Sequence, residues 1–439
     1  FNTSSPRFIG QAAAPTSVEQ GDVRVGIDLA TESLAAKLGA EKLSWERFLA
    51  VSSAAGGLRM TVHGLVYEMT VRAAREAALG AGAIIHFVST GRLSQGDLKK
   101  ILHIHPNIIL ISGGVDHGER ETALYNSRKI CELLAEQQLS IPVIYAGNVA
   151  NQDEVREIFE EQGKKLYLVE NVYPRIDELR IEETRRVIQR VFEEHITGGP
   201  GMARLRERVD GSIIPTPGGV MEAAKLLREE IGDLLVIDVG GATTDVHSVS
   251  PGSEEVSRVL ISPEPLAKRS VEGGLGTYVN RKNVLQGRAL ERAAELLGCS
   301  VEELESRLEL LPPIPQQPRE IELAEILTES AAAQALSRHV GRYRSIYGPE
   351  GKKELAEGKD LSAVRYAIAT GGALTRLPNR EKILRKALDS LPANSLAPPK
   401  NVELLFDRDY IMAVAGVLAT EYPAEALQLL KESLWADRR

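Results

Sequence analysis

The sequence contains very little cysteine and no long apolar run. Cys131 and Cys299 are the only cysteines among 439 residues. Two are too few for a disulfide framework or a thiolate metal cage, and they fit a reducing cytoplasm. No uninterrupted apolar stretch approaches the roughly 18–20 residues that a membrane-spanning helix needs, so we expect no membrane partner.

Blocks of positive charge are also missing. The chain has 53 Lys and Arg against 61 Asp and Glu, a net charge of −8. Nucleic-acid binding rests on Lys and Arg that neutralise phosphates, so we expect no nucleic-acid partner. The length exceeds what one hydrophobic core usually serves, and it predicts two or more domains.

The clearest chemical pattern present is Asp-Val-Gly-Gly-Ala-Thr-Thr-Asp, which runs from Asp238 to Asp245. An apolar strand at 234–237 leads into it, and consecutive glycine amides can form an anion-binding concavity. The candidate phosphate-binding residues are Gly240, Gly241, Thr243 and Thr244. Asp238 is the candidate Mg²⁺ ligand, through water, because Mg²⁺ prefers oxygen ligands and keeps several waters. Asp245 is a second candidate for orienting water or the metal.

The residues after this loop decide its class. A P-loop or a dinucleotide-binding loop runs into a helix, whereas residues 246–249 read as a strand. The pattern therefore predicts a strand–loop–strand phosphate site. The alternative is an ordinary hairpin turn in which the glycines only satisfy the turn geometry.

Three further segments carry glycine-containing patterns, one directly before the phosphate strand and two after the loop. Pro217, Gly218 and Gly219 open a helix directly before the phosphate strand. Gly371, Gly372 and Ala373 follow an apolar strand and are candidates for binding adenosine. Gly416 lies in a nearly apolar helix predicted at 409–419. Each segment also has a plain structural reading, as a helix start, a turn or a core helix.

Together the four segments resemble the second phosphate motif, the adenosine turn and the two connecting helices of the actin, sugar-kinase and heat-shock-chaperone ATPases. Beyond that superfamily, the chain resembles the glutamate mutase accessory proteins, also called MutL. The matching stretches are 52–58, 110–116, 170–174, 214–217, 236–249, 267–276 and 370–372.

The family resemblance implies an ATP- and Mg²⁺-dependent reactivating chaperone for an adenosylcobalamin-dependent glutamate mutase or aminomutase. A small partner subunit or self-association stays open. Two alternatives remain: a small-molecule kinase of the same superfamily, and a scaffold that binds nucleotide without hydrolysing it.

The fold that the resemblance implies is α/β, with two ribonuclease-H-like lobes and an inserted doubly wound α/β domain. We expect the first lobe at 1–60, the inserted domain at 61–176, and the rest of the first lobe with its connecting helix at 177–232. The second lobe would span 233–439, with a helical insertion near 281–360. His103, His105 and His117 are expected to be surface histidines.

The N-terminal region contains a segment, Gly26 to Thr31, that resembles the first phosphate motif of heat-shock chaperones. Ala30 replaces the glycine which that motif requires, and helical spacing continues through Asp28 from a helix start at Thr16. We therefore expect Asp28 to lie outside the site and the true first motif to lie upstream of Phe1. On this reading the chain as given binds nucleotide poorly.

Overall fold

The computed structural model describes residues 1–2, 5–17, 20–52, 58–196, 202–348 and 351–436. It divides into two compact units. Unit 1 comprises Phe1–Glu222 and Ala413–Leu429, and unit 2 comprises Ala223–Met412 and Leu430–Arg439. Among the described residues, no helix has both the length and the apolar run needed to cross a bilayer.

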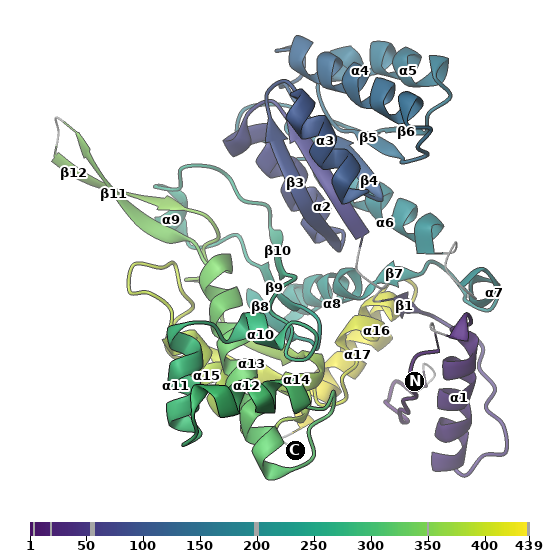
Figure 1. Cartoon of the computed structure of the whole chain (residues 1–439), viewed down its shortest axis with the longest axis vertical. Coiled ribbons are helices and arrows are strands. Elements are labelled where there is room, and N and C mark those ends of the chain that lie inside the picture. The colour runs from purple at the N-terminus through teal and green to yellow at the C-terminus, as the bar shows by residue number, and fades with distance from the viewer. Residues whose placement is uncertain (3–4, 18–19, 53–57, 197–201, 349–350, 437–439) are drawn as a thin grey trace. The chain divides into compact units, whose positions relative to one another are not determined.

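Unit 1 is built on a five-stranded parallel sheet (Figure 1). Its strands are β2 (Leu58–Gly64), β3 (Ala83–Thr90), β4 (Ile108–Ile111), β5 (Val143–Tyr145) and β6 (Leu166–Leu168). Their order is β3-β2-β4-β5-β6, and every neighbouring pair is parallel. This is a doubly wound order, in which the chain turns back between β2 and β4.

Helices cover both faces of this sheet because successive side chains of a strand point to opposite faces. In β4, Ile108 and Leu110 pack into one hydrophobic cluster and Ile109 and Ile111 into another. The helices of unit 1 in this region are α2 (Arg72–Gly80), α3 (Gln95–Ile104), α4 (Glu121–Glu136), α5 (Gln152–Glu161), α6 (Glu182–Ile196) and α7 (Met202–Arg206), with a π-turn at Tyr67–Val71 and a 3-10 turn at Val149–Asn151.

The N-terminal part of unit 1 differs from the sequence prediction. Helix α1 spans Arg24–Lys37, so it begins eight residues after Thr16 (24 − 16). Ser17 lies outside the helix, where its hydroxyl accepts from the Gly26 amide and donates to the Asp22 carbonyl. Among the described residues 5–14 there is no strand, and Arg7 forms only an isolated bridge with Asn2. The short strands β1 (Val51–Ser52) and β7 (Ile214–Pro215) pair in parallel.

Unit 2 contains a second five-stranded sheet, of mixed direction. Its strands are β8 (Leu234–Val239), β9 (Thr244–Val249), β10 (Ala267–Glu272), β13 (Tyr366–Thr370) and β14 (Glu403–Phe406). The order is β10-β9-β8-β13-β14. β9 is antiparallel to both of its neighbours, whereas β13 is parallel to β8 and β14 to β13.

One face of this sheet packs against the long helix α13 (Pro318–His339). Leu235 and Ile237 of β8 share a buried cluster with Leu327 and Ala331 of α13. The other helices here are α9 (Glu254–Ser257), α10 (Arg281–Val284), α11 (Arg288–Leu296), α12 (Val301–Leu310), α14 (Gly371–Arg376) and α15 (Arg380–Asp389).

The predicted helical insertion near 281–360 is helical only as far as His339. Residues beyond it form the antiparallel hairpin β11 (Arg342–Gly348) and β12 (Gly351–Glu357) (Figure 1). Tyr343 and Ile346 belong to residue types that favour strands, and Gly351 opens β12 with a φ of 101°. These local preferences override a helical continuation.

Three helices contain the division between the units. These are α8 (Thr216–Ile231), α16 (Met412–Leu418) and α17 (Pro423–Leu434). The chain thus leaves unit 1 within α8 and re-enters it within α16, the two segments in which the sequence predicted connecting helices.

Candidate functional site

The loop Gly240–Thr243 joins β8 to β9 in unit 2. Val239 pairs with Thr244 across the hairpin, and the Gly240 amide donates to the Thr243 carbonyl at 2.9 Å. The loop runs from strand to strand, as the alternating residues after it predicted. The loop therefore belongs to a hairpin, unlike a P-loop.

A separate segment, residues 276–280, fixes the carbonyls of this loop. Amides of Tyr278 and Val279 donate to the Gly241 carbonyl at 2.9 and 2.7 Å, and the Thr277 amide donates to the Gly240 carbonyl at 3.1 Å. The Asn280 side-chain amide donates to the Ala242 carbonyl at 2.8 Å. The segment can approach so closely because Gly276 has no side chain: a Cβ there would collide with the backbone of Ala242.

The amides of the same loop are left available. Within the described residues, the N–H groups of Gly241, Ala242 and Thr243 have no hydrogen-bond acceptor. Gly241 and Ala242 are exposed, and Thr243 is half-buried. Consecutive backbone N–H groups can form a concavity that binds an anion, provided that the neighbouring carbonyl oxygens are hydrogen-bonded elsewhere. This geometry favours the phosphate site over a plain turn.

Asp238, the last polar residue of β8, lies beside this loop and is partly exposed. Burial, reinforced by the charges of Asp245 and Asp407, raises the pKa of Asp238 to about 7, and Arg269 opposes the rise. No described residue donates a hydrogen bond to its carboxylate. A desolvated carboxylate that lacks a donor suits a hydrated cation as its partner.

The predicted adenosine turn lies against Asp238. Thr370 is the Cα partner of Asp238 in the parallel pair of β13 and β8, and Gly371 follows it with a φ of 85°. A Cβ at Gly371 would collide with a carboxylate oxygen of Asp238 and come within 2.6 Å of the Val239 amide nitrogen. Position 371 therefore requires glycine for two reasons: its positive φ and the close approach of the strands.

Gly371 also begins helix α14, so the segment is a strand–helix junction. The Thr375 hydroxyl donates to the Gly371 carbonyl at 2.9 Å and steadies the first turn. Gly372 is half-buried, and a Cβ there would have open space around it. Ala373 is half-buried and packs at the edge of the unit's main hydrophobic cluster.

Asp245 is differently placed from Asp238, because both of its carboxylate oxygens already have partners. Arg269 donates to one oxygen through Nε at 2.9 Å and Nη2 at 2.5 Å, and the Thr243 hydroxyl donates to the other at 3.1 Å. Asp245 and Arg269 are both buried, so each charge depends on the other. The neighbouring Thr244 is buried, and its hydroxyl donates to the Leu275 carbonyl at 2.7 Å.

The residues predicted in connecting helices occupy α8 and α16. Pro217, Gly218 and Gly219 lie in the first turn of α8, and Gly416 is buried in α16. A Cβ at Gly219 would collide with the carbonyl of Ala413, so a small residue is needed where these helices approach within unit 1.

Sequence analysis missed several residues around Asp238. The 276–280 segment, Arg269 and Asp407 all come from distant parts of the chain, although 267–276 was part of the family resemblance. Tyr410 also faces this region: burial, followed by the charges of Asp238 and Asp407, raises the pKa of Tyr410 to about 12. The signal for Asp407 was weak, an acid directly after the short apolar run 404–406.

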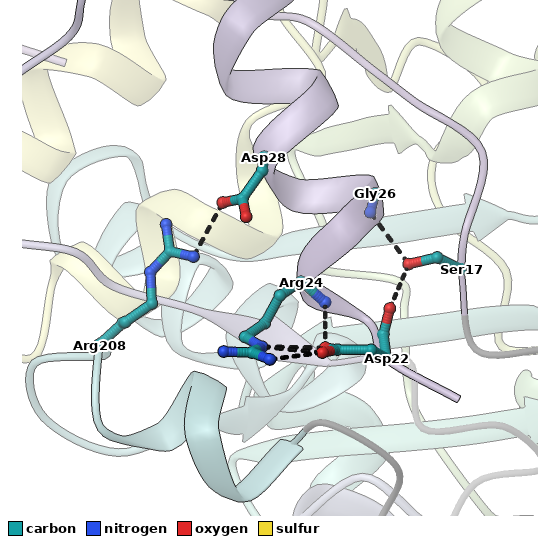
Figure 2. A network of polar contacts seen from close by, with 6 residues as sticks. All are labelled: Ser17, Asp22, Arg24, Gly26, Asp28 and Arg208. Carbon is teal, nitrogen blue, oxygen red and sulfur yellow. Dashed lines mark hydrogen bonds and ion pairs between the residues drawn. The ribbon is translucent and has the colours of Figure 1, made fainter. Parts of the chain in front are cut away.

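Asp28 lies in helix α1 of unit 1. Its carboxylate pairs with Arg208 at 2.8 Å, while Asp22 pairs with Arg24 and the Ser17 hydroxyl accepts from the Gly26 amide (Figure 2). The helix predicted across the segment is confirmed, and the carboxylate of Asp28 has an arginine partner.

The described residues contain no group of three or more His, Cys, Asp or Glu side chains suited to a metal ion. His103, His105 and His117 are exposed, as expected. Mg²⁺ at Asp238 would therefore have to be held mainly by water and phosphate oxygens, which is its common mode in nucleotide sites.

Comparison with known proteins gives one strong match to a family. A family model described as "MutL protein" matches residues 1–434. The curated "Protein MutL" of Clostridium tetanomorphum is 35% identical over 431 residues, which is 95% of this chain and 92% of that protein.

Solved structures give weaker likenesses. The methanol:cobalamin methyltransferase complex MtaBC from Methanosarcina barkeri is 15% identical with a TM-score of 0.25, over 36% of this chain and 55% of that one. Nucleotide-free acetone carboxylase is 14% identical with a TM-score of 0.37, over 91% of this chain and 65% of that one. At TM-scores this low, neither likeness says anything about activity.

Proposed function

The chain belongs to the MutL protein family, and from that membership we propose that it is an ATP-dependent reactivating factor for an adenosylcobalamin-dependent glutamate mutase or aminomutase. It would act in the cytoplasm. Its direct partner would be the mutase, with or without a small partner subunit or a second copy of the chain.

The topology of unit 2 supports an actin-like ATPase lobe. Numbered in chain order, its strands lie 3-2-1-4-5, and only the second is antiparallel to the rest. That is the arrangement expected of a ribonuclease-H-like lobe. We propose that unit 2 is such a lobe, and that the first lobe and the doubly wound sheet share unit 1.

One observation carries the nucleotide proposal. In the loop Gly240–Thr243, the carbonyls of Gly240, Gly241 and Ala242 accept hydrogen bonds from the 276–280 segment. The amides of Gly241, Ala242 and Thr243 have no acceptor among the described residues, and the loop lies directly beside Asp238 and Gly371. The fit to ATP and Mg²⁺ is therefore chemical: backbone donors for phosphate oxygens, and a carboxylate without a donor for a hydrated cation.

Each residue then has a distinct task. Gly241, Ala242 and Thr243 would donate amide hydrogens to phosphate oxygens. Asp238 would orient the water around Mg²⁺, which supplies positive charge to the phosphates when bound. Asp245 would hold Arg269 and the Thr243 hydroxyl, and so keep the loop in shape.

The first turn of α14 would serve the adenosine. Gly371 brings this turn against β8, and Gly372 and Ala373 leave half-buried surface there. Pro217, Gly218, Gly219 and Gly416 would serve the helices through which the chain passes between units.

Reactivation requires that nucleotide state alters the affinity for the mutase. To reverse a two-state equilibrium almost completely, binding to the two states must differ by about 5.5 kcal/mol. We propose that ATP and ADP forms differ in affinity for a mutase carrying damaged cofactor, so that one form loosens the complex.

The first experiment measures Mg·ATP binding by calorimetry and phosphate release on the full-length protein. We expect Asp238→Asn to lower turnover about 100-fold or more while binding weakens less, because phosphoryl transfer depends on positioned charge. Glu254→Gln is the control, since Glu254 has a side chain 96% exposed in the same unit. Unchanged turnover in Asp238→Asn would remove Asp238 from the site.

The second experiment supplies fresh cofactor to an inactivated cobalamin-dependent mutase. Activity should return only when the full-length protein and ATP are both present. Recovery that is equal without ATP would argue for a nucleotide-bound scaffold, and ADP formation dependent on a small substrate would argue for a kinase.

A further inference from the structure

The carboxylate of Asp407 joins three elements of unit 2 at one buried point. Asp407 follows β14 and has no exposed surface. One oxygen accepts from the Ile411 amide at 3.0 Å and the Ser433 hydroxyl at 2.9 Å. The other accepts from the Met412 amide at 2.8 Å and the Thr370 hydroxyl at 2.9 Å.

These donors belong to elements that are far apart in the sequence. Thr370 is the last residue of β13 and directly precedes Gly371. Ile411 directly precedes α16, Met412 is its first residue, and Ser433 lies near the end of α17. A backbone bond adds to the link, since the Asp407 amide donates to the Ala369 carbonyl at 2.9 Å.

We propose that Asp407 is a positioning residue that couples nucleotide occupancy at Gly371 to the start of helix α16. The inference rests on the proposed function, because it requires nucleotide at this turn. It adds a route by which the site controls a helix that contributes no residue to it.

Thr370 is the residue that connects the nucleotide turn to Asp407, because it directly precedes Gly371 and its hydroxyl donates to the Asp407 carboxylate. Gly371 packs directly against Asp238, where an added Cβ would collide with the carboxylate. We expect a shift of the turn on nucleotide binding to reach Thr370, the residue that directly precedes Gly371. The Thr370 hydroxyl and the Met412 amide bind the same oxygen of Asp407, so a change at one donor is felt by the other.

At the other end of this connection, Met412 lies where the chain passes from unit 2 to unit 1. Met412 is the last residue of unit 2 before α16 continues in unit 1 as Ala413. Bistable packed elements, rather than gradual deformation, usually carry such coupling. The buried carboxylate with four donors offers that kind of discrete contact.

Two matched variants test the coupling, because each removes one hydroxyl donor from the same carboxylate. Thr370→Val removes the bond to the turn, whereas Ser433→Ala removes the bonds from α17 to Asp407 and to the Asp409 amide. The measurement is hydrogen–deuterium exchange of the amides in α16 on the full-length protein, with and without Mg·ATP, together with the Kd for Mg·ATP from calorimetry.

In the wild type and in Ser433→Ala, Mg·ATP should change exchange in α16 by about tenfold, the effect expected of one hydrogen bond to a charged group. In Thr370→Val the nucleotide-dependent change should disappear, while the Kd stays within about threefold. A purely structural cap on α16 would alter exchange equally with and without nucleotide.

The experiment separates failure of the proposed nucleotide site from failure of the Asp407 coupling. Absence of Mg·ATP binding in the wild type would overturn the proposed function itself. Normal binding with no change in α16, or a full change retained in Thr370→Val, would overturn the role of Asp407 and leave the nucleotide site standing.

Discussion

The carboxylate of Asp238 should weaken the folded protein when no nucleotide is bound. Its pKa is about 7 in the folded chain and about 3.8 ordinarily. A difference of about three units corresponds to about 4 kcal/mol once both states are ionised. This cost, of up to about 4 kcal/mol, is the effect to be expected when the charged form of a carboxyl group is desolvated in the folded chain.

The sign follows from which state loses its proton first. Below pH 4 both states are protonated, and Asp238 costs nothing. Between pH 4 and 7 the unfolded chain ionises while the folded chain keeps the proton, so stability falls as pH rises. Above pH 7 the cost is constant. Asp238→Asn should therefore stabilise the protein, by up to about 4 kcal/mol at pH 8 and by less than about 2 kcal/mol at pH 5.

Urea unfolding at these two pH values measures the difference. The chain has two tryptophans, Trp45 and Trp435. Trp435 packs edge-on against Tyr366 of β13, with ring centroids 6.2 Å apart. In a Trp45→Phe background, fluorescence thus reports unit 2 alone. Glu254→Gln should change nothing. A destabilised Asp238→Asn, or a difference that is the same at pH 5 and 8, would refute the reasoning.

Three more predictions concern nucleotide binding to the full-length protein, measured by calorimetry. Affinity for Mg·ATP should rise about tenfold from pH 6 to pH 8, as Asp238 ionises, and this rise should vanish in Asp238→Asn; a pH-independent wild type would contradict the assignment. Gly371→Ala should weaken binding at least tenfold, because it adds backbone strain and a collision, whereas Gly372→Ala has open space and should bind nearly normally. Gly276→Ala should also weaken binding by displacing the segment that ties the loop, and Gly273→Ala, again with open space, is its control; equal affinities in the pair would show that the segment is dispensable.

The sequence predicted the phosphate hairpin because its signals are local. Asp238 to Asp245 contains the strand end, the glycines and the alternation of the next strand within a few residues. The helices of the doubly wound sheet also carry local signals. Ser94 and Asp97, for example, form a capping box at the start of α3.

Elements that depend on distant partners escaped prediction. β2 is a central strand of its sheet, yet Leu58–Gly64 has only three alternating apolar residues and follows a glycine pair. β14 has four residues, Glu403–Phe406, and within the part of the chain that the structure describes it pairs with β13 alone. Pairing of this kind is decided by neighbours across the fold, so propensity alone could not place either strand.

The candidate site divides in the same way. Its glycines and Asp238 are readable from one segment, but the features that make it a site are contacts across the chain. The 276–280 segment turns the loop carbonyls away from the anion, and Asp407 ties the turn at Thr370 to α16. Asp245 was expected to orient water or metal, and only the fold brings Arg269 to its carboxylate.

The most direct test of the account observes the loop amide itself. In full-length protein labelled with ¹⁵N-glycine, the Gly241 resonance can be assigned by its loss in Gly241→Ala. Adding Mg·ATP should shift the Gly241 amide strongly downfield, because a free donor gains a phosphate acceptor, and it should leave Gly273 unmoved. Saturation with Mg·ATP that leaves Gly241 unshifted would contradict the claim that this loop binds the phosphates.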